Sequence, residues 1–370
     1  MKKLGFGAMR LPKLSETASD IDHSQVCRMV DTFIENGFTY FDTAYMYHDG
    51  TSEMAVRDDL VRRYDRERFL LADKLPTMRL NEVADMQRIF DEQRTKCGVE
   101  YFDYYLLHNL NTRFYETAVK LDAFDFIRRK KEEGSVKNIG FSFHAGADLL
   151  EEILSKNPDV DFVQLQINYL DWEHAGIQSR KCYEVARKYG KPVIVMEPVK
   201  GGTLAKLPER AEALMRAYAP DASPASWAIR YAASLEGVMT VLSGMSDYSQ
   251  LCDNIGYMKD FKPLSAEEQD IIRRVQTIMY ESTAIPCTGC AYCTEGCPAN
   301  IPIPEFFSLY NAELQAENKG FSTQEVYYSN HVKAGVKASD CIACGQCETQ
   351  CPQNLPVIEL LKSVARTFEE

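Results

Sequence analysis

Residues 69–108 read FLLADKLPTMRLNEVADMQRIFDEQRTKCGVEYFDYYLLH, and this stretch contains the unit that decides the fold. Two short apolar runs, Phe69–Ala72 and Tyr104–His108, flank a segment with helical apolar spacing, Glu82–Thr95. Strands separated by a helical crossover indicate a parallel β/α unit.

The same alternation extends from residue 1 to about residue 260. Helical spacing recurs between further apolar runs, at Gln25–Glu35, Tyr115–Glu133, Gly176–Tyr189 and Ser226–Ser234. With the two runs above, the strand-like segments number eight, the others being Leu4–Ala8, Thr39–Thr43, Val136–Phe141, Phe162–Ile167, Val193–Met196 and Val238–Leu242. Eight units in this length predict a (β/α)8 TIM barrel. A doubly wound sheet is the competing architecture, but no G-x-G-x-x-G opens a helix.

Eight cysteines near the end of the chain form two copies of the pattern C-x2-C-x2-C-x3-C-P. They are Cys287, Cys290, Cys293 and Cys297, then Cys341, Cys344, Cys347 and Cys351. This spacing is typical of bacterial ferredoxins, in which the fourth cysteine of one copy ligates the other [4Fe–4S] cluster. Zinc sites have no need of a third evenly spaced cysteine. The pattern therefore predicts two [4Fe–4S] clusters.

The cysteine loops mark a second domain. Helical spacing at Asp247–Lys259 and Ala266–Ser282 follows the last strand-like run, and further helix-capable segments occur at Pro304–Gln315 and Val357–Phe368. We expect a barrel with C-terminal helices over residues 1–282 and a small, mainly helical two-cluster ferredoxin domain over residues 283–370.

Composition limits the partners. The net charge is 42 − 54 = −12, which argues against nucleic acid because phosphate binding requires basic patches. No apolar run is long enough to span a bilayer. We expect a cytoplasmic protein. The four remaining cysteines, Cys27, Cys97, Cys182 and Cys252, lie in stretches with helical spacing and are expected to be buried thiols.

Four reactive side chains fall where predicted strands end, which in a barrel is the face that holds active sites. Asp42 and Tyr47 follow the second strand, Lys74 the third and His108 the fourth. A phenol is a weak proton donor at neutral pH, and a neighbouring ammonium group lowers its pKa. A carboxylate keeps the lysine charged, and the imidazole can bond to a substrate oxygen. The set suits carbonyl reduction.

Five parts of the sequence resemble the aldo-keto reductase family: Leu4–Leu11, Asp42-Thr43-Ala44-x-x-Tyr47, Ser52-Glu53, Lys74 and His108. The resemblance covers about the first 260 residues, and the fused ferredoxin is similar to that of a bacterial subgroup of the family. It implies hydride transfer between NADPH or NADH and a small carbonyl or alcohol. It also implies that Tyr47 is the general acid, Lys74 its pKa modulator and Asp42 the lysine's partner, while His108 orients the carbonyl.

The resemblance also implies nicotinamide contacts, with departures from the family pattern. Ser142 and Gln164 match residues that hold the carboxamide, although Phe143 replaces the usual asparagine. Met196 stands where an aromatic residue commonly stacks on the ring. In the loop after the eighth strand, Gln250 and Asn254 match adenosine-contacting positions, but Gly244 and Gln250 replace the lysine and arginine that clamp the NADP 2′-phosphate. Preference between NADH and NADPH stays open.

The clusters need a reason to be present, because carbonyl reduction by a nicotinamide requires none. They could connect the barrel to a redox partner protein, form a docking module, or act as a structural element or redox sensor. A flavin could convert between one and two electrons, although no motif indicates one. The alternative function is an electron-transfer or complex subunit whose barrel uses no nicotinamide. We also expect another element, such as the ferredoxin domain, to cover the barrel floor.

Overall fold

The computed structural model describes residues 2–174, 177–281, 284–287, 289, 291, 293–294, 296–316, 322–351 and 355–370. Cys290, one of the eight predicted cluster ligands, lies outside the described residues, as do Ser282 and residue 283 at the predicted domain boundary.

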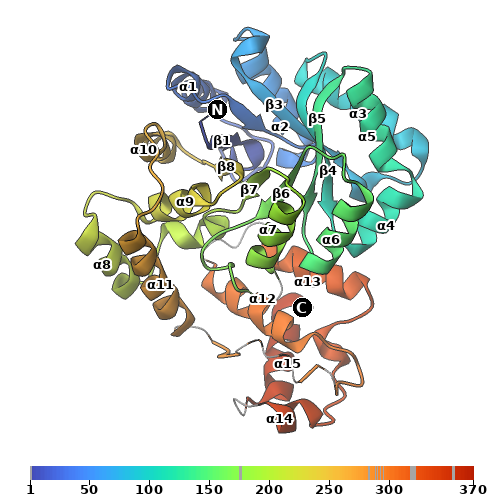
Figure 1. Cartoon of the computed structure of the whole chain (residues 1–370), viewed down its shortest axis with the longest axis vertical. Coiled ribbons are helices and arrows are strands. Elements are labelled where there is room, and N and C mark those ends of the chain that lie inside the picture. Colours follow the sequence, from blue (N-terminus) through green and yellow to red (C-terminus); the bar gives the residue numbers. More distant parts are fainter. Residues whose placement is uncertain are drawn as a thin grey trace.

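Eight parallel strands close into a barrel in chain order, with β1 paired to both β2 and β8 (Figure 1). The strands are β1 (Leu4–Gly7), β2 (Tyr40–Asp42), β3 (Leu70–Pro76), β4 (Phe102–Leu110), β5 (Val136–Phe143), β6 (Phe162–Gln166), β7 (Val193–Met196) and β8 (Val238–Gly244). The predicted TIM barrel is therefore confirmed, and each strand overlaps its expected run.

Helices surround the barrel: α1 (His23–Glu35), α2 (Ser52–Val56), α3 (Val83–Cys97), α4 (Thr112–Lys120), α5 (Ala123–Glu132), α6 (Ala147–Lys156), α7 (Ser179–Lys188), α8 (Glu209–Tyr218), α9 (Pro224–Ser234), α10 (Tyr248–Met258) and α11 (Ala266–Glu281). The single helix expected over residues 115–133 is two helices. Asp122 between them has φ of 56°, a left-handed conformation that interrupts an α-helix.

Bulky side chains fill the barrel interior, as in other TIM barrels. Tyr40, Leu106, Phe162, Ile194 and Leu242 form one buried cluster there with Ala72. Gly140 in β5 makes room for Phe162, because a Cβ at this glycine would lie 2.5 Å from the Phe162 carbonyl oxygen. The packed interior leaves the chemistry to the ends of the strands.

The C-terminal region is helical, as expected. It contains α12 (Ile303–Gln315), α13 (Thr323–Lys333), α14 (Gln346–Gln350) and α15 (Val357–Phe368). These helices share a hydrophobic core of their own, in which Phe306, Phe307, Tyr328, Leu361 and Val364 are almost fully buried. The core explains how this small region holds its shape beside the barrel.

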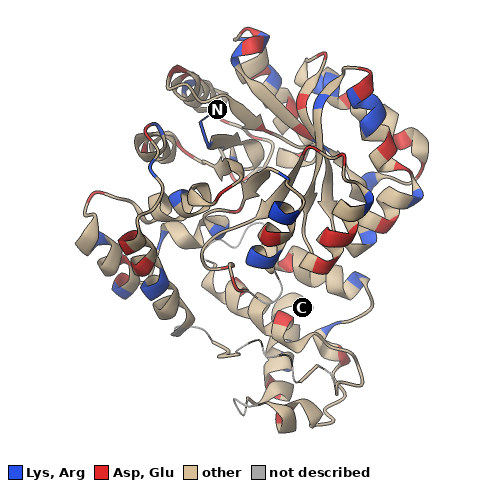
Figure 2. Cartoon of the chain, viewed as in Figure 1, with Lys and Arg blue, Asp and Glu red and all other residues tan. Residues whose placement is uncertain are grey.

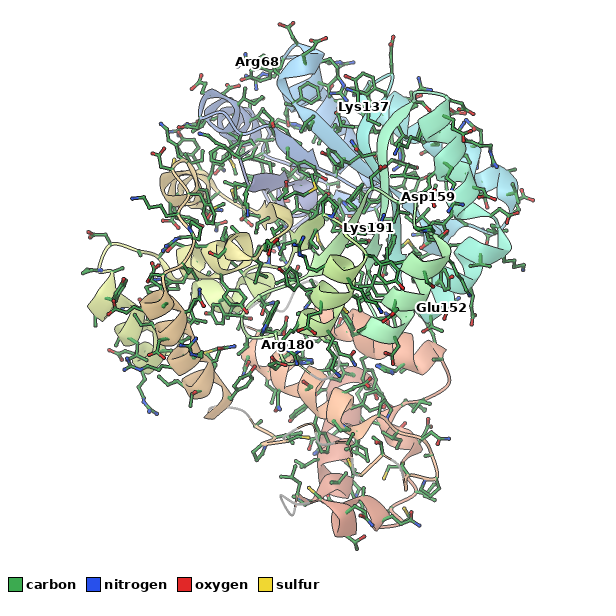
Figure 3. All side chains as sticks on the ribbon, in the orientation of Figure 1. Arg68, Lys137, Glu152, Asp159, Arg180 and Lys191 are labelled. Atoms are coloured by element: carbon green, nitrogen blue, oxygen red, sulfur yellow. The ribbon has the colours of Figure 1, made fainter. Side chains whose placement is uncertain are left out.

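The C-terminal helices lie at the carboxyl ends of β5 to β7, with α12 and α13 next to the barrel (Figure 1). Arg180 of α7 is labelled on the side of the barrel toward the C-terminal helices (Figure 3). His174 after β6 bonds to Ser308 of α12, 2.5 Å apart, and Ile177 joins the C-terminal core. The expectation that this domain could cover the barrel floor is therefore wrong, since it lies at the opposite face.

Charged side chains of both signs alternate over the outer helices (Figure 2). Within the described parts of the chain, no helix is both long and apolar enough to cross a membrane. Cys97 and Cys182 are buried as predicted, whereas Cys27 is half-buried and Cys252 is exposed. The prediction of buried thiols is wrong for Cys252, because helical spacing alone does not reveal which face a residue occupies.

Candidate functional site

Lys74 and Asp42 form a buried ion pair at the carboxyl ends of β3 and β2. The Lys74 ammonium donates to Asp42 Oδ1 at 2.5 Å and to the Thr43 carbonyl oxygen at 2.6 Å. The Gln164 amide on β6 donates to the other carboxylate oxygen of Asp42 at 3.3 Å. The lysine is thus fixed by three strands of the barrel.

Tyr47 and His108 lie on the same side of this pair. Lys74 Nζ is 4.8 Å from the centre of the Tyr47 ring. The rings of Tyr47 and His108 meet edge to face, with 6.1 Å between their centres. The structure therefore brings together all four residues that the sequence singles out.

Burial and charge set the protonation of the group. Burial would lower the pKa of Lys74, but the charge of Asp42 and its hydrogen bond with the lysine outweigh burial and raise the pKa, so the ammonium persists. Burial raises the pKa of Tyr47, and Lys74 offsets only part of that rise. Burial therefore outweighs the lowering of the phenol pKa predicted from the lysine, and the phenol is protonated at neutral pH and can donate a proton.

His108 is neutral at physiological pH. Burial, reinforced by the charge of Lys74, lowers the pKa of His108 well below its ordinary value of 6.5. Its Nδ1 is buried without a hydrogen-bond partner among the described residues, while part of the ring stays accessible. A neutral imidazole with an accessible edge can orient a carbonyl by a hydrogen bond.

The residues expected at the nicotinamide ring lie near the carboxyl ends of β5, β6 and β7, on the same face of the barrel as these four residues. The buried Ser142 hydroxyl on β5 accepts from the Asn109 amide at 2.8 Å, and Gln164 already bonds to Asp42. Met196 ends β7 and is half-buried. Phe143, in the place of the family's asparagine, is buried in the hydrophobic core.

Arg10 is a candidate that sequence analysis missed. It follows β1, and its guanidinium lies 3.8 Å from a Glu197 carboxylate oxygen, with no hydrogen bond among the described residues. A Cβ on Gly244 would come within 3.1 Å of the Arg10 side chain, and one on Gly201 within 3.7 Å of Arg10 Nη2. A half-buried cation beside glycines fits the pyrophosphate of a dinucleotide. Three loops make this site, which explains why no local motif indicates it.

The loop after β8, expected to bind the adenosine phosphate, bonds to its own protein instead. The Ser246 amide donates to Gln250 Oε1 at 2.8 Å, and the Gln250 amide to Asp247 Oδ1 at 2.9 Å. The Tyr248 amide donates to Gln25 Oε1 at 3.0 Å. Asn254 donates to the Ser243 hydroxyl at 2.9 Å. The amides of Ser246, Tyr248 and Gln250 are therefore not available to a phosphate, and the Asp247 carboxylate lies at the start of α10.

Cysteines from both motifs gather around one cavity. Cys297 of the first motif lines it together with Cys341, Cys344 and Cys347 of the second. The rest of the lining is apolar and includes Ile301, Ile303, Ile342, Ile358 and Leu361. Cys287, Cys293 and Cys351 pack in the same core. Within the described residues, no group of three or more histidine, cysteine, aspartate or glutamate side chains is arranged to hold a metal ion.

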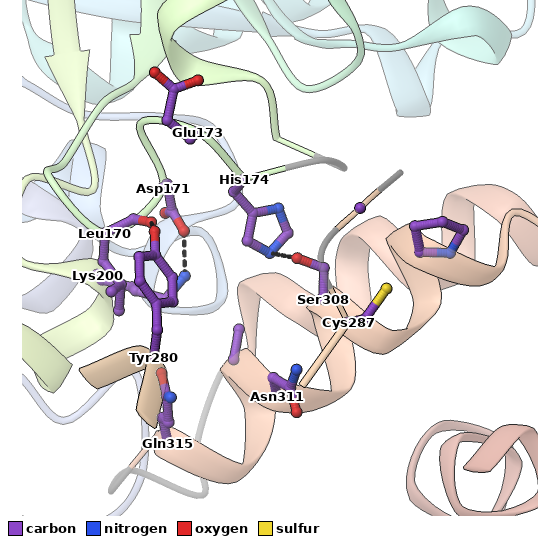
Figure 4. A pocket seen from close by; sticks show the side chains of 13 residues that line it. Leu170, Asp171, Glu173, His174, Lys200, Tyr280, Cys287, Ser308, Asn311 and Gln315 are labelled. Carbon is purple, nitrogen blue, oxygen red and sulfur yellow. Dashed lines mark hydrogen bonds and ion pairs between the residues drawn. The ribbon is translucent and has the colours of Figure 1, made fainter. Parts of the chain in front are cut away.

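A second cavity, of about 280 Å³, lies between the barrel and the C-terminal helices (Figure 4). A buried pair lines its barrel side, with Lys200 Nζ 2.5 Å from Asp171 Oδ1. His174 and Ser308 meet at its edge, and Cys287 forms part of the opposite wall. None of Asp42, Tyr47, Lys74 and His108, which we call the tetrad, lines this cavity.

We expect acid to weaken the contact between the barrel and the C-terminal helices by protonating His174. Its Nδ1 accepts from the Ile177 amide at 3.2 Å, so the neutral ring carries its proton on Nε2, which faces Ser308. Burial lowers the pKa of His174 from 6.5 to about 4. The pKa of His174 is lower in the folded state than in the unfolded state. Its contribution to the free energy of unfolding is therefore complete above pH 6.5 and is lost as the pH falls toward 4.

We therefore expect His174→Gln to weaken this pH dependence. Between pH 7.5 and 5.5, wild type should lose about 1.4 kcal/mol more stability than the variant, one pKa unit of difference. Urea unfolding of the cluster-loaded protein at the two pH values measures this. Equal losses in both proteins would contradict the assignment.

Residues 3–277 match the Aldo/keto reductase family, and residues 286–355 match the 4Fe-4S dicluster domain. A TIM barrel with these strand-end residues defines the class, and the first match spans most of the chain. The chain therefore belongs to the aldo/keto reductase family and carries a C-terminal 4Fe-4S ferredoxin domain.

Among known relatives, the uncharacterized oxidoreductase YqkF of Bacillus subtilis (strain 168) is 22% identical over 288 residues, covering 69% of this chain and 86% of YqkF. The holo form of aldo-keto reductase AKR11C1 from Bacillus halodurans superposes with a TM-score of 0.59 at 24% identity, over 74% of this chain and 91% of that one. An aldo-keto reductase from Klebsiella pneumoniae in complex with NADPH gives 0.57 at 19%, over 74% and 90%. These structures support the barrel fold.

Proposed function

We propose that this protein reduces a small carbonyl compound, or oxidises the corresponding alcohol, with a nicotinamide dinucleotide. The convergence of Tyr47, Lys74, Asp42 and His108 on one buried network carries the proposal. A proton donor and a neutral hydrogen-bonding imidazole face the same space, as addition of a hydride and a proton across C=O requires.

Each residue has a distinct task. The neutral His108 orients the carbonyl oxygen through its accessible edge, and the Tyr47 hydroxyl gives that oxygen its proton. The phenolate that forms is stabilised by the Lys74 ammonium, which Asp42 holds in place. When bound, the dinucleotide supplies the hydride to the carbonyl carbon. In the reverse direction, Tyr47 accepts the alcohol proton.

Side chains at the carboxyl-end face of the barrel are suited to holding the dinucleotide. Ser142, Gln164 and Met196 border the nicotinamide end, Arg10 beside Gly244 and Gly201 is placed for the pyrophosphate, and Gln250 and Asn254 border the adenosine end. The Asp247 carboxylate at the start of α10 would repel the 2′-phosphate of NADPH and tolerate the ribose hydroxyl of NADH.

We therefore expect NADH to bind at least about tenfold more tightly than NADPH, a difference of about 1.4 kcal/mol. Hydrogen bonds from Ser249 and Gln250 outweigh burial and lower the pKa of Asp247, so the carboxylate is charged at neutral pH. Asp247→Ser should bring the two dissociation constants together, as measured by titration calorimetry. Asp253→Ser, on the next turn of α10, is the control. An NADPH preference in wild type would contradict this assignment.

The cysteines suit two [4Fe–4S] clusters. Cys297, Cys341, Cys344 and Cys347 would hold one, and Cys287, Cys290, Cys293 and Cys351 the other, which is the crossover pattern of two-cluster ferredoxins. Such clusters move single electrons and could exchange them with a redox partner protein. A cytoplasmic location accords with this chemistry. A flavin is not part of this proposal, because no sequence motif indicates one.

Anaerobic assays of the full-length, cluster-loaded protein test the function. Oxidation of NADH or NADPH should depend on added aldehyde or ketone, and both nucleotides should be titrated for binding. If neither NADH nor NADPH binds to protein whose clusters can still be reduced, the electron-transfer subunit would be favoured instead.

A further inference from the structure

The C-terminal domain places a tyrosine at the catalytic face of the barrel. Tyr327 on α13 is only 6% exposed. Its ring packs edge to face against the ring of His144, with 5.7 Å between the two centres. His144 directly follows β5, and its amide donates to the carbonyl oxygen of Leu110 at the end of β4. The contact therefore lies at the strand ends, beside the tetrad.

His144 and Glu197 connect Tyr327 to the tetrad. Burial is the main cause of the lowered pKa of His108, and charge on His144 would lower it further, so the imidazoles are neighbours. Burial also raises the pKa of both Tyr47 and Tyr327, and the Glu197 carboxylate adds to both shifts. Glu197 is thus within electrostatic range of both phenols. Ring contacts accompany these effects, since Tyr47 packs against His108 and Tyr327 packs against His144.

The hydroxyl of Tyr327 is not bonded to another described part of the protein. It makes no hydrogen bond within the described residues, yet it is not among their fully buried polar atoms without partners. The adjacent Tyr328 behaves differently: its hydroxyl bonds to Glu369 and accepts from the Ala338 amide, so it serves the C-terminal core. Both tyrosines belong to the C-terminal hydrophobic core, but the ring of Tyr327 also contacts His144 of the barrel.

We propose that Tyr327 is a specificity-determining residue of the carbonyl pocket and that, with His144, it forms the wall opposite Tyr47. The pocket is then complete only when the ferredoxin domain is in place. A tyrosine offers an apolar ring to a substituent of the substrate and a hydroxyl for a hydrogen bond. This inference rests on the proposed carbonyl reduction and gives the ferredoxin domain a role in substrate selection besides electron transfer.

The test compares a large and a small carbonyl probe in the full-length, cluster-loaded protein. Tyr327→Ala should raise KM for 4-nitrobenzaldehyde about tenfold, because the ring of this aldehyde can no longer pack against the Tyr327 ring. KM for propanal should change less than about twofold, since propanal is too short to reach Tyr327, and kcat for propanal should be retained. Tyr328→Phe is the control for disturbance of α13 and should leave both KM values unchanged.

The outcomes separate the two proposals. Failure of wild type to reduce either aldehyde would overturn the proposed function. Reduction of both, with an unchanged KM for 4-nitrobenzaldehyde in Tyr327→Ala or equal increases for both probes, would overturn the role of Tyr327 alone. If Tyr327→Ala loses iron, Tyr327→Trp decides: its larger ring should crowd the pocket and raise KM for 4-nitrobenzaldehyde selectively, and an unchanged KM would again overturn the inference.

Discussion

Replacing Tyr47 with phenylalanine is expected to lower kcat for carbonyl reduction by about 10²- to 10⁴-fold, the usual contribution of a positioned proton donor. Phenylalanine keeps the ring against His108 and near Lys74 but removes the only group of the tetrad that is both protonated and able to reach the oxygen as an acid. His108 stays neutral through burial and cannot replace it efficiently. Steady-state kinetics with a saturating aldehyde measure the loss.

The matched control is Tyr45→Phe. Tyr45 lies two residues away in the same loop, but its hydroxyl donates to Glu92 at 3.1 Å, outside the tetrad. This variant should retain kcat, and both variants should bind the nicotinamide nucleotide as wild type does. Equal turnover of Tyr47→Phe and wild type would disprove the acid role of Tyr47, and loss of nucleotide binding would show that the substitution had disturbed the site.

Cys297→Ser is expected to remove one cluster, the one held by the second cysteine motif. Wild type should contain about eight iron atoms and the variant about four, because a [4Fe–4S] cluster needs its full ligand set. The grouping of Cys297 with Cys341, Cys344 and Cys347 around one cavity is the reason. Iron analysis and the EPR spectrum of the reduced protein measure the loss.

Double variants show which cysteines share a cluster. Cys297→Ser with Cys341→Ser should still contain about four iron atoms, because both changes affect the same cluster. Cys297→Ser with Cys287→Ser should lose both clusters, although these two cysteines belong to one motif. The opposite pattern would show that each motif holds its own cluster. Cys252→Ser, at an exposed cysteine of α10, should keep all the iron and serves as the control.

The proposed role of Tyr327 gives one answer to why a reductase barrel carries this domain. A hydride transfer needs no cluster, but a substrate pocket needs a wall over the open mouth of the barrel. α13 lies against that mouth, and the cavity lined by Lys200, His174 and Cys287 lies between the catalytic face and the first cysteine loop. We therefore expect loss of the clusters to affect substrate binding as well as the electron transfer proposed for them.

The sequence by itself determined the barrel, the helical C-terminal domain and the residues that carry chemistry. Strand periodicity is local, so each strand such as β3 overlaps its predicted run. Strand ends of a closed parallel barrel meet at one face, so Asp42, Lys74 and His108 had to be neighbours once the barrel was assigned. Cysteine spacing is local as well, because three thiols on one tight loop must bind the same cluster.

Only the tertiary structure decided which distant groups meet. Arg10 gains its place from the glycines of two other loops, and Cys297 crosses to the other motif. At the start of α10, the Tyr248 amide donates to Gln25, a residue far away in the sequence. Tyr327 contacts His144 because the C-terminal core packs against the barrel. Such docking depends on the shapes of whole surfaces, and a one-dimensional pattern of residues does not contain them.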